Sequence, residues 1–482
     1  MFMNIKRFIL LLILALALFL RFWQTPARYG IGYDGSRDAL VAFESARSFQ
    51  LPLTGSFSSI GPITFGPWYY WIITFSNFII PSPWAPWILI GLSSLMTVYV
   101  MYKIGVLLEN ETLGLILALL ASISPAQINS ATPLQQHALI GFFSSLAIFI
   151  LLRLNSKKNF YNLATLWGFV IGIAINTHFQ AAGLIFLPIF FFIFSRKIRL
   201  IPSFLMGLFF SMIPILIFEL NNHWFNTRNI LDYIFIGQYR VWTSNRWLTF
   251  AGKFIPEFWA YTLGAPFILS MIMMVVAAFL IIFRLLQKKL KLSLFLISIS
   301  FAVLVIMLRY YRGEKFFGYL QFFHPYIFIF NGYVLYTLIK WLKNLYFRIL
   351  LIIIYIAVVL PSSLNTIQSD KLNMITSNRL NQLIKSYPNK KFSFYDCVVV
   401  HDVDRIQALI LLAYMQKAYD KNGYKIAMFN SSCNYTNTKK LSNDIVDVNQ
   451  LTKKELEKRG LEERTAYGVY AETARWWFKE QP

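Results

Sequence analysis

Long hydrophobic stretches recur along the first three quarters of the chain and are separated by short polar connections. A helix needs ~20 mainly apolar residues to cross a bilayer. Most of these stretches approach that length, and we predict that each forms a membrane-spanning helix. They are residues 8–23, 85–107, 113–128, 134–153, 161–177, 180–195, 200–220, 259–284, 291–308, 318–341 and 346–361. The pattern predicts an α-helical polytopic membrane protein with about eleven spans.

The first stretch follows Lys6 and Arg7 and so resembles a signal sequence. Arg21, Phe22 and Trp23 stand where a cleavable signal would have small residues. We therefore predict an uncleaved first helix.

Residues 63–80 are apolar but short, rich in aromatic residues and interrupted by Pro67. If this segment lies in the membrane interface, the basic loops from Lys6 and Arg7 through to Arg348 all fall on one side. Because cytoplasmic loops carry the excess of Lys and Arg, that arrangement is favoured over a full span. It predicts a plasma or inner membrane protein with a cytoplasmic N-terminus and an extracytoplasmic C-terminal part.

The chain becomes polar after residue 362. Alternating and periodic hydrophobic positions predict a strand at 392–400, a helix at 404–419, a strand at 424–429 and a last strand or helix at 467–478. We therefore divide the chain into a transmembrane domain, 1–362, with a first outer loop at 24–84, and an extracytoplasmic α/β domain, 363–482. Cys397 and Cys433 both fall in the second domain, where they either form a disulfide or remain two separate thiols.

Composition agrees with a membrane protein and argues against a nucleic-acid-binding one. The 482 residues are 57% hydrophobic, 18% aromatic and only 14% charged, whereas globular proteins carry about a quarter charged residues. The net charge of +23 arises from basic residues at the ends of apolar spans, and no basic run interleaves with aromatics. No His or Cys spacing indicates a metal site, so none is assigned, and assistance by a divalent cation is left open.

Candidate chemistry begins in residues 31–47, just beyond the first span. Asp34 and Asp38 lie one helical turn apart, with Arg37 placed to hold at least one carboxylate ionised. The simpler interpretation makes Asp34 a helix cap and Asp38 only an arginine partner, and spacing alone favours it. Acids at the outer membrane surface keep the catalytic interpretation open.

Cations near 309–315 run against the charge rule, because they stand where a span reaches the outer face. Arg309, Arg312 and Lys315 are candidates for binding a phosphate or diphosphate. Snorkelling of these side chains is an equally good explanation.

Further polar and aromatic residues are expected on the same outer face. We assign them to substrate binding: Tyr69, Tyr70, Gln136, His137, His178, Gln180 and His324, together with Arg37. For each histidine, a structural hydrogen-bonding role at a helix end is the more common alternative.

The chain resembles the GT-C superfamily of membrane glycosyltransferases, nearest to the protein O-mannosyltransferase and aminoarabinose transferase group of glycosyltransferase family 39 type. The resemblance extends over most of residues 5–345. It rests on Tyr-Asp-Gly-Ser-Arg-Asp-Ala at 33–39, Gly61-Pro62, Gly66-Pro67-Trp68-Tyr69-Tyr70-Trp71, Ser124-Pro125 and Arg312-Gly-Glu-Lys315.

The resemblance implies a glycosyltransferase that moves a sugar from a polyprenyl-phosphate carrier to an acceptor hydroxyl outside the cytoplasm, with inversion. The acceptor is a lipid, a glycan or a protein. Asp34 occupies the position of the family's first-loop base. The family often has a second acid directly after it, where this chain has Gly35, so Asp38 becomes the second acid. His178 stands where relatives have a lysine, and Gln136 and His137 stand where some have an aspartate.

Two other functions remain as alternatives. A ligase or polymerase that joins lipid-linked glycans would rely mainly on the outer arginines. A lipid-sugar flippase or exporter would need charged residues within its spans and related halves, and the sequence shows neither.

Overall fold

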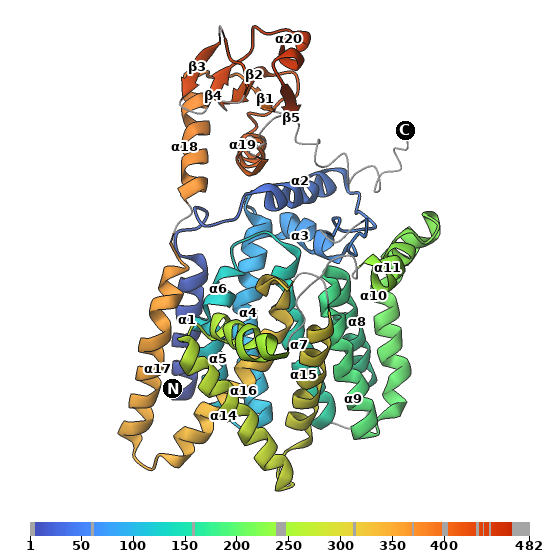
Figure 1. Cartoon of the computed structure of the whole chain (residues 1–482), viewed down its shortest axis with the longest axis vertical. Helices are drawn as coiled ribbons and strands as arrows, with labels where there is room; N and C mark the ends of the chain where they lie inside the picture. The colour runs from blue at the N-terminus through green and yellow to red at the C-terminus, as the bar shows by residue number, and fades with distance from the viewer. Residues whose placement is uncertain are drawn as a thin grey trace.

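The computed structural model shows a bundle of helices with a small sheet domain at one end (Figure 1). It describes residues 5–58, 62–156, 160–237, 247–311, 315–368, 371–397, 403–429, 433–436, 438–442 and 445–464. The first helix, α1 (Ile5–Phe22), rises toward the end of the bundle that carries the sheet domain. The helices of the first loop lie between the bundle and the sheet domain, so the candidate acids fall at this junction.

Apolar helices make up the bundle, as predicted. After α1 they are α4 (Ala85–Leu108), α5 (Glu111–Ile123), α7 (Ile140–Ser156), α8 (Tyr161–Thr177), α9 (Phe186–Ser195), α10 (Ile201–Asn221), α14 (Phe267–Leu286), α15 (Leu292–Tyr310), α16 (His324–Trp341) and α17 (Leu345–Asn365). Within the described residues, seven helical stretches are long and apolar enough to cross a membrane. A polytopic α-helical membrane fold is confirmed; the number eleven stays a prediction.

Short helices connect or extend these elements. They are α6 (Pro125–Asn129), η1 (Gln136–Leu139), η2 (Phe179–Ile185), η3 (Ile198–Leu200), α11 (Phe225–Phe235), α12 (Trp247–Thr249), η5 (Phe250–Phe254), α13 (Ile255–Leu263) and η6 (Phe317–Phe323). Four of them, η1, η2, η3 and η6, directly precede a longer helix, so several spans begin with a tighter or irregular turn.

The segment expected as one span at 259–284 is divided in two. Helix α13 ends at Leu263, and α14 starts at Phe267. Between them Gly264 has a φ of +74°, the left-handed conformation in which helices commonly end, and Pro266 cannot continue the preceding helix. The apolar composition of the stretch concealed this break.

The first loop forms two helices, α2 (Tyr33–Ser48) and α3 (Trp68–Ile79). Helix α3 spans only 12 residues, which is too short to cross a bilayer. This length agrees with the interfacial helix predicted at 63–80. The buried residues of α2 include Ala39, Leu40 and Ala42.

The C-terminal part contains a five-stranded sheet with two helices in the same region, α19 (Val403–Met415) and α20 (Lys453–Lys458). Its strands are β1 (Phe392–Cys397), β2 (Tyr424–Met428), β3 (Lys439–Ser442), β4 (Ile445–Asp447) and β5 (Leu461–Arg464). The strand order is β3-β4-β2-β1-β5, with only the β1–β2 pair parallel among the described pairings.

The first three predicted elements of the C-terminal domain are confirmed. The element expected at 467–478 lies outside the described residues. A further helix, α18 (Lys371–Ser386), joins the domain to the bundle. Cys397 and Cys433 form a disulfide, which selects one of the two alternatives for this pair.

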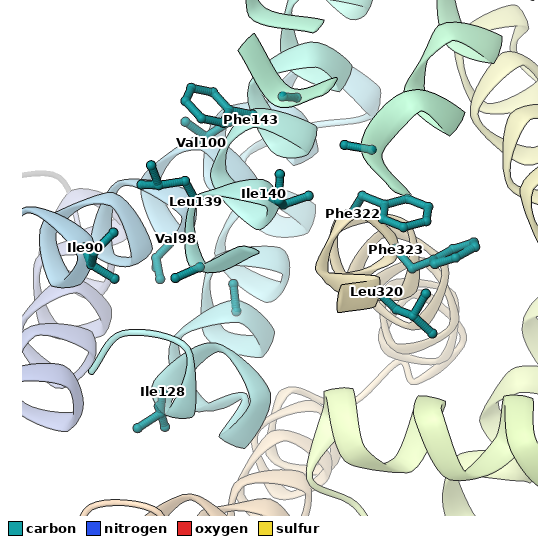
Figure 2. Packing of buried hydrophobic residues seen from close by; sticks show 14 of the residues in the cluster. Ile90, Val98, Val100, Ile128, Leu139, Ile140, Phe143, Leu320, Phe322 and Phe323 are labelled. Carbon is teal, nitrogen blue, oxygen red and sulfur yellow. The ribbon is translucent and has the colours of Figure 1, made fainter. Parts of the chain in front are cut away.

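A continuous apolar core fills the bundle below the first loop. Figure 2 shows part of it, where Ile140 at the start of α7 lies on the side of the segment that carries Phe322 and Phe323. The Ser144 hydroxyl donates to the Phe322 carbonyl at 2.7 Å. Because interiors are close-packed, the loop segments that begin α7 and α16 are held rigidly at this end of the bundle.

Candidate active site

Gly32 directly precedes helix α2, so both candidate acids lie inside the helix. The Ser36 amide donates to the Gly32 carbonyl at 2.8 Å, and no side chain caps this end. Asp34 therefore lies in the first turn and is not the helix cap, so the capping interpretation is wrong. An acid in the first turn is still stabilised by the amides there, because they carry a partial positive charge.

Arg37 bridges the two acids. Its Nη1 lies 2.9 Å from Asp34 Oδ1, and its Nη2 lies 2.8 Å from Asp38 Oδ1. Its Nε also donates to Asp38 Oδ1 at 2.8 Å. Asp38 is only 1% exposed, whereas the Asp34 side chain is 54% exposed. The two carboxylates are therefore chemically distinct, because only Asp34 is open to solvent.

The buried carboxylate is also bound from the neighbouring helix. Tyr70, on α3, donates its hydroxyl to Asp38 Oδ1 at 2.7 Å. Burial raises the pKa of Asp38, while the positive charge of Arg37 and the Tyr70 hydrogen bond act against that rise. Burial lowers the pKa of Arg37, but the negative charge of Asp38 and its neighbours outweighs the effect of burial. The pKa of Arg37 therefore stays well above its ordinary value.

A cavity of about 330 Å³ opens in front of this network. Its wall contains residues predicted from three separate parts of the sequence: Asp34, Arg37, Asp38, Gln136, His137, His178 and Gln180. The Gln136 side chain is fixed by a hydrogen bond from its amide nitrogen to the Ser56 hydroxyl. The expected convergence of these polar groups is therefore present in the structure.

Aromatic rings also line the cavity. The His178 ring lies 4.9 Å from that of Tyr319 and stacks on Phe65 at 5.1 Å. The His137 ring lies 5.3 Å from Tyr319. Burial, reinforced by the nearby His137, lowers the pKa of His178 to about 3. His178 is consequently a neutral side chain near neutral pH, suited to hydrogen bonding or stacking.

Of the predicted phosphate-binding cations, Arg309 and Lys315 are described, and neither is among the residues that line the cavity. Lys315 is placed over the ring of Tyr311 at 5.9 Å, and Tyr311 lines the cavity. Burial and the positive charge of Arg309 both lower the pKa of Lys315. Arg309 itself is buried, with its guanidinium 4.9 Å from the Trp247 ring. Arg312 lies outside the described residues.

Three predicted binding residues do not line the cavity. Tyr69 and Tyr70 are buried behind α2, where Tyr70 acts on Asp38. His324 is also buried, and its Nδ1 lies 2.7 Å from the Gln127 amide nitrogen. Its position agrees with the structural alternative given for a histidine at a helix end.

Several lining residues were missed by the sequence reasoning: Ser56, Phe57, Ser58, Phe65, Phe179, Tyr311, Phe316 and Tyr319. Half of them directly adjoin a motif that was recognised, such as Phe65 before Gly66-Pro67 and Phe316 after Lys315. For these adjoining residues, proximity to a motif is the signal that could have identified them. The described residues contain no group of three or more His, Cys, Asp or Glu that could hold a metal ion.

Comparison with solved structures identifies the fold. The chain is similar to ArnT from Cupriavidus metallidurans in the apo state, with a TM-score of 0.52 and 14% identity over 86% of this chain and 69% of that one. The fold is therefore similar to that of ArnT, which agrees with the resemblance inferred from the motifs.

Two further structures are similar to the chain. ArnT from the same organism bound to undecaprenyl phosphate gives a TM-score of 0.51 at 14% identity, over 84% of this chain and 68% of that one. The Archaeoglobus fulgidus oligosaccharyltransferase tethered to an acceptor peptide gives 0.50 at 14% identity, covering 80% of this chain and 57% of that one. The chain thus spans little more than half the length of the oligosaccharyltransferase.

A family model described as dolichyl-phosphate-mannose-protein mannosyltransferase matches residues 64–219 of the chain. This range includes all of η1 and η2, which supply Gln136, His137 and Gln180 to the cavity. A search of the curated proteins found no match.

Proposed function

We propose that the protein is a glycosyltransferase that transfers a sugar from a polyprenyl-phosphate carrier to an acceptor hydroxyl at the outer face of the membrane. The observation that carries the proposal is the half-exposed Asp34 at the wall of a polar and aromatic cavity, supported by the buried Arg37–Asp38–Tyr70 network. The matched family model and ArnT, which has been solved with undecaprenyl phosphate, support a donor linked to a lipid phosphate.

In the proposed reaction, Asp34 accepts the proton of the acceptor hydroxyl as its oxygen attacks the anomeric carbon. The bond from that carbon to the phosphate oxygen breaks on the opposite face, so the configuration inverts and the lipid phosphate leaves. Lys315, Arg309 and Arg312 would hold the leaving phosphate, since Arg and Lys bind phosphate well. Positioning and charge neutralisation would supply most of the acceleration, with the base adding ~10²–10⁴.

The remaining cavity residues would position the sugar. Rings such as Phe65, Tyr319 and the neutral His178 offer flat faces, while Gln136 and Gln180 offer amides for hydroxyl groups. Asp38 would act on the reaction only through Arg37, because it is buried. Asp38 is therefore a positioning residue in this proposal, which leaves Asp34 as the single proposed base.

The proposal is tested by Asp34→Asn in the full chain, with Asp232→Asn as the matched control. Asp232 is an exposed acid on α11 and does not line the cavity. Mass spectrometry of glycans and glycolipids from cells that lack the gene would reveal the product restored by the wild type. We expect Asp34→Asn to reduce that product by ~10²–10⁴ at equal expression, and Asp232→Asn to restore it fully. Full restoration by Asp34→Asn would refute the proposed base.

A further inference from the structure

A second cavity lies outside the candidate active site, between the first loop and the C-terminal domain. It has a volume of about 740 Å³. Its walls come from the end of α2, the α3–α4 connection and the segments that flank α19 and β1. The two parts of the chain meet here through Phe43, whose ring stacks on that of Tyr414 at 6.3 Å, and through the Tyr414 hydroxyl, which donates to Glu44. We refer to this space as the interdomain cleft.

The interdomain cleft is strongly basic. Arg47, Lys391, Lys417 and Lys421 line it, and Asp420 is the acid among its lining residues. Asp420 lies 4.0 Å from Lys391, with both side chains about half exposed, so the pair is only weakly stabilised. The lining therefore keeps a positive excess, which suits an anionic group.

An apolar groove lies on the adjoining side of α2 and α3. It measures about 570 Å³ and is lined by residues of α2, α3 and α4, among them Phe49, Phe75 and Phe78. Phe49 is 82% exposed and stacks on Phe78 at 5.7 Å. The last turns of α2 and α3 contribute to both spaces: Ser45 and Phe78 line the groove, while Ala46 and Asn77 line the cleft.

The position of the groove determines what can fill it. Helix α4 is long enough to span the membrane, and α3 is a short aromatic helix at its end. An apolar groove at this level faces hydrocarbon, and a basic cleft beside it faces the headgroup layer. A molecule with acyl chains and an anionic head matches both surfaces, because apolar burial and headgroup charge add to lipid binding.

We propose that the interdomain cleft and the adjoining groove form a binding site for an anionic membrane lipid. The headgroup lies among Arg47, Lys391, Lys417 and Lys421, and the acyl chains lie along Phe49, Phe75 and Phe78. The site is separate from the cavity of Asp34, with which it shares no lining residue. It also requires both domains, since the C-terminal domain supplies three of the four cations.

Lys417 allows an unusually clean test. Lys417 follows the end of α19 and has a φ of 57°, a left-handed conformation that glycine adopts more readily than lysine. The Ala418 amide donates to the Ala413 carbonyl at 2.8 Å, as expected after a left-handed helix end. Lys417→Gly therefore removes a cation without disturbing the backbone that carries it.

The experiment is native mass spectrometry of the full chain released from detergent micelles that contain equal amounts of phosphatidylglycerol and phosphatidylcholine with the same acyl chains. The wild type should retain phosphatidylglycerol preferentially. The double variant K417G/K421Q should lower that preference by roughly tenfold or more, because a cation near a membrane surface contributes about 1 kcal/mol to binding an anionic lipid. The matched control K454Q/K458Q removes two lysines of α20 that do not line the cleft, and it should keep the preference.

Three outcomes would overturn the proposal. They are a wild type that retains both lipids equally, an equal loss of preference in K454Q/K458Q, and displacement of the lipid by inorganic phosphate, which would indicate a free-anion site. Retention of dihexanoyl phosphatidylglycerol as strong as that of the long-chain lipid would remove the groove from the site. Asp34→Asn should keep the lipid preference. Failure of the lipid-binding proposal can therefore be distinguished from failure of the proposed glycosyl transfer.

Discussion

At the scale of single residues, burial divides the roles of the two acids on α2. Asp38 is enclosed and held by Arg37 and Tyr70, whereas Asp34 shares Arg37 but remains half exposed. A carboxylate that accepts a substrate proton must be within reach of the substrate. Asp34 satisfies this condition, and Asp38 fixes the arginine that orients it.

Removing the Tyr70 hydroxyl tests this division. In Tyr70→Phe the buried Asp38 loses a hydrogen bond, and its pKa, already raised by burial, rises further. Asp38 then takes up a proton at a higher pH, and Arg37 loses its closest negative partner. We expect the acidic limb of the pH–activity profile to move to higher pH and the free energy of unfolding to fall by about 1–3 kcal/mol.

The control for this variant is Tyr355→Phe on α17. The Tyr355 hydroxyl is buried and has no hydrogen-bond partner within the described part of the chain. Its removal should leave the pH–activity profile unchanged. An acidic limb that stays in place in Tyr70→Phe would contradict the proposed role of Asp38.

The depressed pKa of His178 makes a separate prediction about stability. The native pKa is about 3, against about 6.5 in an unfolded chain, so between these values the unfolded state binds more protons. The stability that His178 contributes is complete above pH 6.5 and is lost as the pH falls toward 3. At pH 5 the loss is on the order of 2 kcal/mol, from about 1.4 kcal/mol per pH unit.

We expect His178→Phe to retain more of its pH 7 stability at pH 5 than the wild type does, as measured by thermal unfolding in detergent. His223→Phe replaces an exposed histidine and is the matched comparison. Parallel losses of stability in the wild type and His178→Phe would indicate that His178 does not become buried in its neutral form.

Sequence reasoning found the polar residues of the cavity because their chemistry is conspicuous in apolar surroundings. Gln136, His137, His178 and Gln180 interrupt hydrophobic stretches, and each adjoins a predicted span end. It missed Phe65 and Tyr319, because one aromatic among 90 Phe, Tyr, Trp and His residues carries no local signal. It overestimated His324, since spacing does not show whether a histidine faces a cavity or a core.

At the scale of elements, the start of α2 depends on the absence of a side chain at Gly35. A Cβ atom there would lie 2.3 Å from the Gly30 carbonyl oxygen, far closer than van der Waals contact permits. Gly30 in turn pairs with Pro133, just before η1. The backbone contact thus connects the helix of the acids to the segment that carries Gln136 and His137.

This contact explains why Gly35 stands directly after Asp34, where the motif of the GT-C superfamily often has a second acid. We expect Gly35→Ala to displace α2, lower the free energy of unfolding by about 1–3 kcal/mol and reduce transfer strongly. Gly35→Glu should not act as a second acid and should be at least as destabilising. Wild-type activity and thermal stability in Gly35→Ala would show that α2 can shift at no loss. Gly252→Ala is a suitable control, because nothing lies within 4 Å of a Cβ at that glycine.

Element boundaries were predicted well where polar residues or prolines mark them. The short, aromatic α3 was predicted to be interfacial from Pro67 and from the distribution of charge, and its length of 12 residues agrees with that prediction. The break between α13 and α14 was missed, because hydropathy remains high across Gly264 and Pro266. The position of this helix break depends on local backbone preference, which the hydrophobic pattern does not measure.

At the scale of the whole molecule, the first loop is held between two domains. From below, α2 packs on α3 and the bundle, and from above it meets α19 through Phe43, Glu44 and Tyr414 (Figure 1). Nothing in the sequence indicated this contact, because it joins residues 370 positions apart whose types are ordinary for a helix face. Such long-range docking depends on how complete surfaces fit together.

The disulfide provides the last test, because it acts on the domain that covers the first loop. Cys397 and Cys433 are 36 residues apart, and closing a loop of that length stabilises a fold by about 3–4 kcal/mol in the chain-entropy model. The double variant C397S/C433S should therefore make the sheet domain sensitive to proteolysis at lower temperature. Because α3 and the Gly30–Pro133 contact hold α2 independently, glycosyl transfer should fall much less than in Asp34→Asn. Protease resistance that remains at the wild-type level, also under reducing conditions, would show that the surrounding core of Val446, Leu456 and Leu461 stabilises the domain alone.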